Sequence, residues 1–117
     1  MMRNGLAQSQ AMPPEPENII DFEGRRIRVS SERWQHILDH PEMHDQQDRL
    51  NETLSNPDIV ISTAKDELIH IYHKRYDKTP VTRKYLVIVV KLSEIDGFIV
   101  TAYFTSQLKR GSVLWQK

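Results

Sequence analysis

The sequence contains no cysteine among its 117 residues, and this absence excludes disulfide bonds, thiol nucleophiles and cysteine-ligated metal sites. No apolar run approaches the roughly 20 residues that span a bilayer, so we expect no membrane partner. The amino-terminal segment contains no apolar stretch of the kind found in secretory signals. Together these absences predict a cytoplasmic protein.

Net charge is also lacking, since 16 Lys and Arg residues balance 16 Asp and Glu residues. A zero net charge argues against a nucleic-acid binder held by charge alone. The distribution is uneven, however, because residues 1–64 carry 6 basic against 11 acidic residues and residues 65–117 carry 10 against 5. The basic half indicates a surface for an anion such as a phosphate backbone, or strand edges that charge keeps from associating.

The hydrophobic content is sufficient for one compact domain, because 38 % of the residues are hydrophobic and the chain has an ordinary domain length. Residues 1–23 are mostly polar and contain Pro13, Pro14 and Pro16. They cannot bury enough apolar area to offset the entropy of ordering, so we predict a flexible tail. Residues 24–117 are predicted to form the single domain.

Two helices are expected after a short edge strand at residues 25–29. Ser30 or Ser31 can cap the first helix, and Pro41 stops it. The first helix places its apolar residues on one side at the 3.6-residue period: Trp34, Ile37 and Leu38. The second helix is predicted from about Met43 to Ser55, with this stripe: Met43, Gln47, Leu50 and Leu54. The Asn56-Pro57 pair ends it.

The remaining chain alternates with a period of two, which is typical of strands. Four segments rich in β-branched and aromatic residues lie at 58–64, 67–76, 84–92 and 97–106. They predict an α+β fold, with two N-terminal helices packed on one face of a four- to five-stranded antiparallel sheet. The other sheet face would be left available for binding.

Alternation also predicts which side chains share a face of the last strand. The core side is expected to hold Phe98, Val100, Ala102 and Phe104. The opposite, polar side is expected to hold Ile99, Thr101, Tyr103 and Thr105. In the strand at 67–76, most hydrogen-bonding groups fall on the set Leu68, His70, Tyr72, Lys74 and Tyr76. We predict that these groups join Thr101 and Tyr103 on one nucleotide-binding face.

The segments ERWQHILDHPEM, YHKRY, KYLVIVVKL, FIVTAYFT and KRGSVLW follow one another in this order. In order and spacing they resemble the phage and toxin branch of the Barnase, EndoU, colicin and RelE group of nucleases, abbreviated BECR. The resemblance covers about residues 24–117. It implies a metal-independent ribonuclease without a cofactor, often deployed as a toxin, with RNA and a cognate antitoxin or immunity protein as partners.

Metal-free RNA cleavage needs a base for the ribose 2′-OH, an acid for the leaving 5′-oxygen and donors for the phosphorane charge. The resemblance assigns the helix histidine to His36, with His40 as a second candidate, the strand cation to Lys74 and the hydroxyl pair to Thr101 and Tyr103. It leaves open which group is the base and which the acid. Further substrate contacts are expected from Tyr72, Tyr76, Lys91, Lys109 and Arg110.

Two alternatives accompany this hypothesis. His36, His40 and His44 follow an i, i+4, i+8 spacing that could hold a metal ion. Because Pro41 interrupts the helix between them, we predict no metal site. The second alternative is a non-catalytic RNA- or protein-binding module that keeps the same fold.

Overall fold

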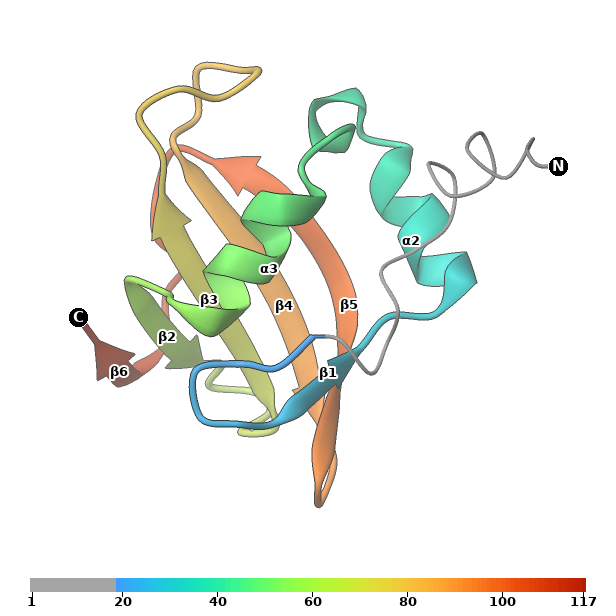
Figure 1. Ribbon diagram of the computed structural model, residues 1–117. Coiled ribbons are helices and arrows are strands. Elements are labelled where there is room, and N and C mark those ends of the chain that lie inside the picture. Colours follow the sequence, from blue (N-terminus) through green and yellow to red (C-terminus); the bar gives the residue numbers. More distant parts are fainter. Residues whose placement is uncertain (1–18) are drawn as a thin grey trace, which may run out of the picture.

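The computed structural model describes residues 19–117, which form an α+β fold with one mixed sheet and two α-helices (Figure 1). The strands are β1 Arg26–Arg28, β2 Ile59–Ser62, β3 Ile69–Arg75, β4 Tyr85–Leu92, β5 Asp96–Thr105 and β6 Ser112–Gln116. The helical elements are α2 Ser31–Leu38, the 3₁₀ helix η2 Pro41–Met43 and α3 Gln47–Ser55. Within residues 19–117, no helix is long and apolar enough to cross a membrane.

The α+β class is confirmed, but the predicted sheet of four to five antiparallel strands is wrong in two respects. The sheet has six strands, in the order β1-β5-β4-β3-β2-β6. The predicted edge strand β1 runs parallel to β5, with Ile27 beside Gly97, whereas β6 pairs antiparallel with β2 at the other edge. An edge strand of three residues is too short for its sequence pattern to predict which strand it pairs with or in which direction. Its pairing depends on its position in the folded chain.

The first helix begins and ends where the sequence predicts. The Ser30 side chain accepts a hydrogen bond from the Arg33 backbone N–H at 3.1 Å and so caps α2. Trp34 and Ile37 are buried toward the sheet. Pro41 opens the separate turn η2, because the residue before a proline disfavours helical backbone.

The second helix is shorter than predicted. Met43 belongs to η2, and Asp45 adopts a left-handed φ of 64°, so the chain turns before α3 begins at Gln47. Gln47 is exposed and does not continue the predicted apolar stripe. The helix ends where predicted, at Ser55 before the Asn-Pro pair.

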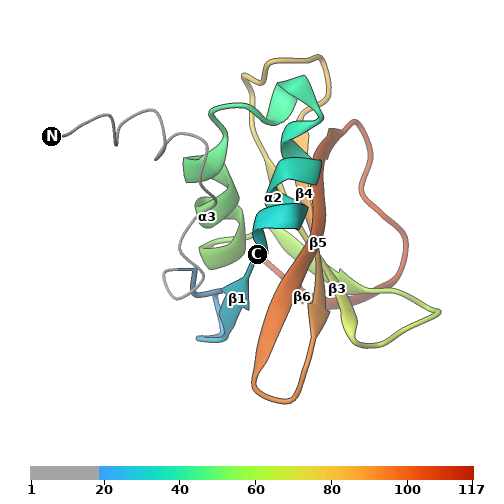
Figure 2. The same ribbon diagram turned by 90° about the vertical axis from the view of Figure 1, so that its right-hand side faces the viewer.

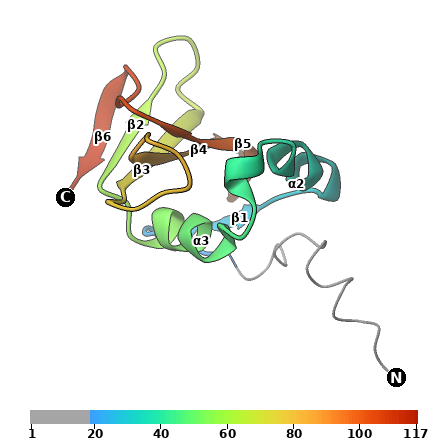
Figure 3. The same cartoon turned by 90° about the horizontal axis from the view of Figure 1, so that it is seen from above.

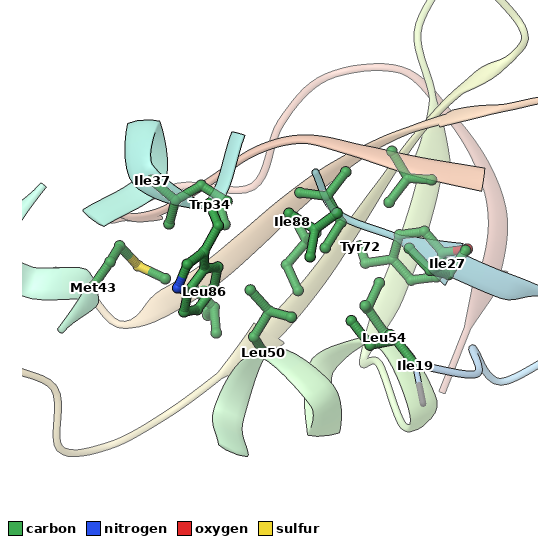
Figure 4. Packing of buried hydrophobic residues seen from close by; sticks show 14 of the residues in the cluster. Ile19, Ile27, Trp34, Ile37, Met43, Leu50, Leu54, Tyr72, Leu86 and Ile88 are labelled. Atoms are coloured by element: carbon green, nitrogen blue, oxygen red, sulfur yellow. The ribbon is translucent and has the colours of Figure 1, made fainter. Parts of the chain in front are cut away.

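The main core lies between the helices and one face of the sheet. Figure 4 shows Trp34 and Ile37 from α2, and Leu50 and Leu54 from α3, gathered around Leu86 and other strand residues. Met43 reaches the same core from η2 and is 1 % exposed. Burial of each large apolar side chain stabilises the fold by roughly 1.5–3 kcal/mol. This packing covers one face and leaves the opposite face without a helical layer (Figure 2).

The predicted faces of β5 are partly wrong, because this strand contains a β-bulge. Val89 pairs with Thr101 but Val90 pairs with Ile99, so Val100 is the extra residue. The bulge reverses the alternation on its N-terminal side. Ile99 is therefore in the core with an exposed fraction of 2 %, and Phe98 is 46 % exposed. The predicted sides are wrong for these two residues and correct for the residues after the bulge.

The first described residues belong to the packed domain. Ile19 is 1 % exposed and lies in the main core, and Asp21, two residues further along the chain, is also buried. Residues 19–23 therefore form part of the fold, although the sequence analysis places them in the tail. The rest of the predicted tail, residues 1–18, lies outside the described residues.

Candidate functional site

The sheet face turned away from the helices, here called the open face, is ordered by strand register. His73, Val87 and Tyr103 form one row across β3, β4 and β5. The neighbouring rows place these residues on the same face: Ile69, Ile71, Arg75, Tyr85, Val89, Lys91, Thr101 and Thr105. Together with Ile59 and Ile61 of β2, the aliphatic members form a second apolar cluster. The open face is therefore an apolar floor with hydroxyl, phenol and cationic groups.

Residues 106–111, here called the strap, connect β5 to β6 across the open face (Figure 2). The Lys109 backbone N–H donates to Nε2 of His73 at 3.0 Å. The Lys109 ammonium lies 5.5 Å from the centroid of the Tyr103 ring, within cation–π range. At Gly111 a Cβ would lie 2.1 Å from the Ser62 carbonyl oxygen, so only glycine fits. These contacts fix the strap at its centre and at its end.

His73 holds the strap to the sheet as a neutral side chain. It is fully buried, and burial lowers the pKa of its imidazole. Because Nε2 accepts the Lys109 hydrogen bond, the hydrogen of the neutral ring sits on Nδ1. Nδ1 is buried and has no hydrogen-bond partner among the described residues. His73 thus positions Lys109, a role that the sequence pattern does not predict.

The cations of the open face differ in whether they are paired. Lys91 forms an ion pair with Asp66, and Arg75 forms one with Asp77. Within residues 19–117, no ion pair is formed by Lys109 or Arg110. Positive charge that an anionic ligand could neutralise is therefore concentrated on the strap.

Three hydroxyl side chains of β5 lie on the open face beside this charge. Thr101, Tyr103 and Thr105 occupy successive outward positions and are each partly exposed. A tyrosine ring can stack on a base, and hydroxyls can donate to phosphate or ribose oxygens. The predicted pair Thr101 and Tyr103 thus shares the open face, and Tyr103 lies beside Lys109.

Lys74 does not join this group. Its row continues through Leu86 and Phe104, which are both core residues on the helix side. The Lys74 ammonium donates to the Asn56 carbonyl oxygen at 2.8 Å and lies 3.6 Å from a carboxylate oxygen of Asp58. It holds the connection between α3 and β2, so the predicted approach of Lys74 to Thr101 and Tyr103 is wrong.

Tyr72 and Tyr76, predicted as substrate contacts, also lie on the helix side. Tyr72 is fully buried, and its hydroxyl donates to Oδ2 of Asp21 at 2.6 Å. Burial is the main cause of the raised pKa of Tyr72. The Tyr76 hydroxyl donates to Oε1 of Glu52 at 2.6 Å. The Arg49 guanidinium lies over the Tyr76 ring, 4.4 Å from the ring centroid. Their hydroxyls serve the fold rather than the open face.

His36 and His40 are exposed, but the elements that carry them bury Trp34, Ile37 and Met43 in the helix-side core, so the two histidines do not lie on the open face with Thr101 and Tyr103. His36 lies in α2, and His40 precedes η2; both elements contact β5 (Figure 3). His44 instead lies with Nε2 2.9 Å from the Leu38 carbonyl oxygen. Within the described part of the chain, no group of three or more His, Cys, Asp or Glu residues could hold a metal ion.

The sheet thus carries a helical layer on one face and hydroxyls and unpaired cations on the other. Residues 4–116 match the family described as phage-Barnase-EndoU-ColicinE5/D-RelE like nuclease2. The chain belongs to this family, and the resemblance to the BECR nucleases is confirmed. Comparisons with curated proteins and with solved structures found no match.

Proposed function

We propose that the chain is an endoribonuclease, acting as a toxin in the cytoplasm, that cleaves RNA on the open face without a metal ion. The observation that carries this proposal is that Thr101, Tyr103 and the unpaired Lys109 lie on the sheet face that no helix covers. Membership of a nuclease family supports phosphodiester cleavage as the reaction.

In the proposed reaction the scissile phosphate lies over Tyr103 and beside the Lys109 ammonium. A base removes the 2′-OH proton, the 2′-oxygen bonds to phosphorus, and the bond to the 5′-oxygen breaks. An acid protonates that oxygen, leaving a 2′,3′-cyclic phosphate and a 5′-hydroxyl end. The ammonium stabilises the phosphorane charge, and Thr101 orients a non-bridging oxygen. Here Lys109 takes the role that the resemblance assigned to Lys74.

His36 and His40 are the proposed proton carriers. Both are exposed, on elements that pack on the helix side of β5, so the RNA must extend from the open face around the edge of β5 to reach them. Imidazole titrates near neutral pH and can serve as base or acid. Loss of a general acid or base typically lowers the rate by about 10²- to 10⁴-fold. Single His36→Ala and His40→Ala variants, with pH–rate profiles, would assign the two roles.

The proposal is tested by single-turnover cleavage of RNA in excess EDTA, comparing Lys109→Met with Lys74→Met. We expect Lys109→Met to lose roughly 10²- to 10³-fold in rate, as for loss of a donor to a developing oxyanion. Lys74→Met should change the rate only a few-fold while lowering stability. Equal rates for Lys109→Met and the wild type, or cleavage abolished by EDTA, would contradict the proposal.

A non-catalytic binding module is the second candidate, and one observation favours it. Among the described residues, the one histidine on the open face is His73, which is buried and occupied by Lys109. A binding module would bind RNA or a protein on the open face and leave RNA intact. As a toxin, the chain would instead arrest growth on expression, and an acidic antitoxin or immunity protein complementary to the strap would relieve the arrest.

A further inference from the structure

The strap is attached to the sheet at few points between its two ends. All of its residues are exposed. Within residues 19–117, no hydrogen bond joins its backbone to the backbone of another segment. Two of its backbone N–H groups donate to side chains: Gln107 to Oγ1 of Thr105 at 3.4 Å, and Lys109 to Nε2 of His73 at 3.0 Å. Since Thr105 is only two residues from Gln107, the His73 bond is the one that holds the centre of the strap against β3.

Packing adds little to this bond. A pocket of about 480 Å³ separates part of the strap from the sheet, with Ile71 of β3 and Leu108 of the strap among its lining residues. Leu108 is 43 % exposed, so its side chain buries little apolar surface. Segments with few buried contacts open locally while the rest of the fold stays intact. The centre of the strap is therefore held by Lys109, through its bond to His73 and its cation–π contact with Tyr103.

The surroundings of His73 suit a neutral ring. It is fully buried, and its row across the sheet continues through Ile59 of β2 and Val87 of β4. The described part of β2 brings no titratable group to this face, because Ile59 and Ile61 hold its positions there. The nearest titratable groups on the open face come from β3, β4, β5 and the strap: Arg75, Tyr85, Tyr103 and Lys109. His73 therefore faces cations, phenols and aliphatic side chains.

The carboxylates in the vicinity of His73 are engaged elsewhere. The Asp58 backbone N–H donates to the His73 carbonyl oxygen at 2.8 Å. The Asp58 carboxylate, however, accepts from the Arg75 backbone N–H and lies 3.6 Å from the Lys74 ammonium. Asp77 forms an ion pair with Arg75. A proton on His73 would therefore add a buried positive charge that none of these carboxylates balances.

A protonated His73 could not keep the strap in place. Both nitrogens of an imidazolium ring carry hydrogen, so Nε2 would present a donor to the Lys109 N–H, which is also a donor. Turning the ring over would present Nδ1–H instead, with the same result. Burial lowers the pKa of His73, which agrees with a closed strap that holds the ring neutral. A proton can bind only after the strap has moved away from the ring.

We propose that His73 makes the strap sensitive to pH: when its ring takes up a proton, the contact with Lys109 breaks and residues 106–111 lift from the open face while the sheet stays folded. This proposal does not depend on the proposed function, because it concerns the chain without a ligand. In the released form the Lys109 ammonium leaves the Tyr103 ring, and the floor of the pocket at Ile71 opens to solvent. Any ligand that needs Lys109 and Tyr103 side by side would thus be held at neutral pH and released in acid.

The size of the effect follows from proton linkage. A closed strap excludes the proton, whereas a released strap leaves His73 with an ordinary pKa of about 6.5. Protonation of the released form then multiplies the ratio of released to closed strap by about 1.1 at pH 7.5 and by about 33 at pH 5.0. Release should therefore become roughly 30-fold more frequent between these two pH values.

The test is amide hydrogen exchange of the full chain without a ligand, at pH 7.5 and pH 5.0, with each rate divided by that of an unprotected amide at the same pH. We expect the protection of the Lys109 amide to fall roughly 30-fold at pH 5.0. In His73→Gln, which can accept from Lys109 but does not titrate, it should change by less than about threefold. His70→Gln removes a histidine from the helix side of the same strand and should keep the full change.

Val89, in the centre of the sheet, reports global unfolding in the same measurement. Lys109 should exchange at least about tenfold faster than Val89 at both pH values, because the strap opens while the sheet stays folded. This comparison needs no variant. Equal protection of the two amides, a Lys109 change below about threefold in the wild type, or the same fall in His73→Gln would overturn the proposal.

Discussion

The buried imidazole of His73 links the strap to the sheet and should make stability depend on pH. Burial lowers its pKa in the folded state below the ordinary value of 6.5. As the pH falls through about 6.5, the unfolded chain takes up a proton that the folded chain does not. The free energy of unfolding should therefore decrease below that pH, by at most about 1.4 kcal/mol per pH unit for this group. Urea unfolding at several pH values measures the slope.

The control for this prediction is His73→Gln, which can still accept a hydrogen bond at the strap but does not titrate. His70 acts in the same direction, because burial and the Arg25 charge lower its pKa. We therefore expect the variant to keep a smaller slope. A variant slope equal to that of the wild type would show that His73 does not contribute.

The hydroxyl of Tyr72 should matter for stability and not for RNA cleavage. It donates to the buried carboxylate of Asp21, so Tyr72→Phe removes a charge-assisted hydrogen bond from the core. The expected loss is about 1–3 kcal/mol in the free energy of unfolding, with the cleavage rate changed only a few-fold. Tyr76→Phe, which loses a more exposed contact to Glu52, is the matched control and should cost less. A large loss of cleavage in folded Tyr72→Phe would place this side chain in the reaction.

The bulge in β5 can be tested with two neighbouring substitutions. Ile99→Ala should lower the free energy of unfolding by about 2–5 kcal/mol, because it opens a cavity in the core. Phe98→Ala should cost less than about 1 kcal/mol, because the ring is 46 % exposed. Chemical denaturation of both variants measures the difference. Simple alternation through residues 97–106 predicts the opposite order, and that result would refute the bulge.

Some parts of the fold can be predicted from the sequence and others cannot. Periodicity and the Asn-Pro and Pro41 signals locate α2, the end of α3 and four strands, because local backbone preference decides these features. The bulge at Val100 is not visible in the pattern, since one extra residue changes no composition. The parallel pairing of β1 and the addition of β6 depend on contacts between distant segments.

The candidate site can be predicted from the sequence only in part, because some of its contacts join residues that are far apart in the chain. Thr101 and Tyr103 lie on one face, as alternation along β5 predicts, and the Lys109 ammonium lies near the Tyr103 ring. The roles of these residues in a reaction stay a prediction. Lys74 was placed on the wrong face, because alternation within β3 does not say how its faces match those of β5. One feature of the sequence points to His73, because it is a polar residue on the strand face that otherwise holds Ile69 and Ile71. Its contact with the strap depends on the fold and cannot be predicted from this pattern.

Across the whole molecule, the two faces of the sheet have separate roles. The helix side holds the main core and the buried contacts of Tyr72 and Lys74. The open side carries the strap, with its unpaired cations and the pocket beneath it. This division allows a chain without net charge to carry unpaired positive charge on one face, where we propose that RNA binds.

We propose above all that RNA binds on the open face at the strap. The most direct measurement is amide chemical-shift mapping with a single-stranded oligoribonucleotide whose 2′-hydroxyls are methylated, so that it cannot be cleaved. We predict the largest shifts at Tyr103, Thr105 and Lys109, with little change along α3 or at Lys74. Shifts concentrated on α3 and Lys74, or no shifts in excess oligoribonucleotide, would contradict the account.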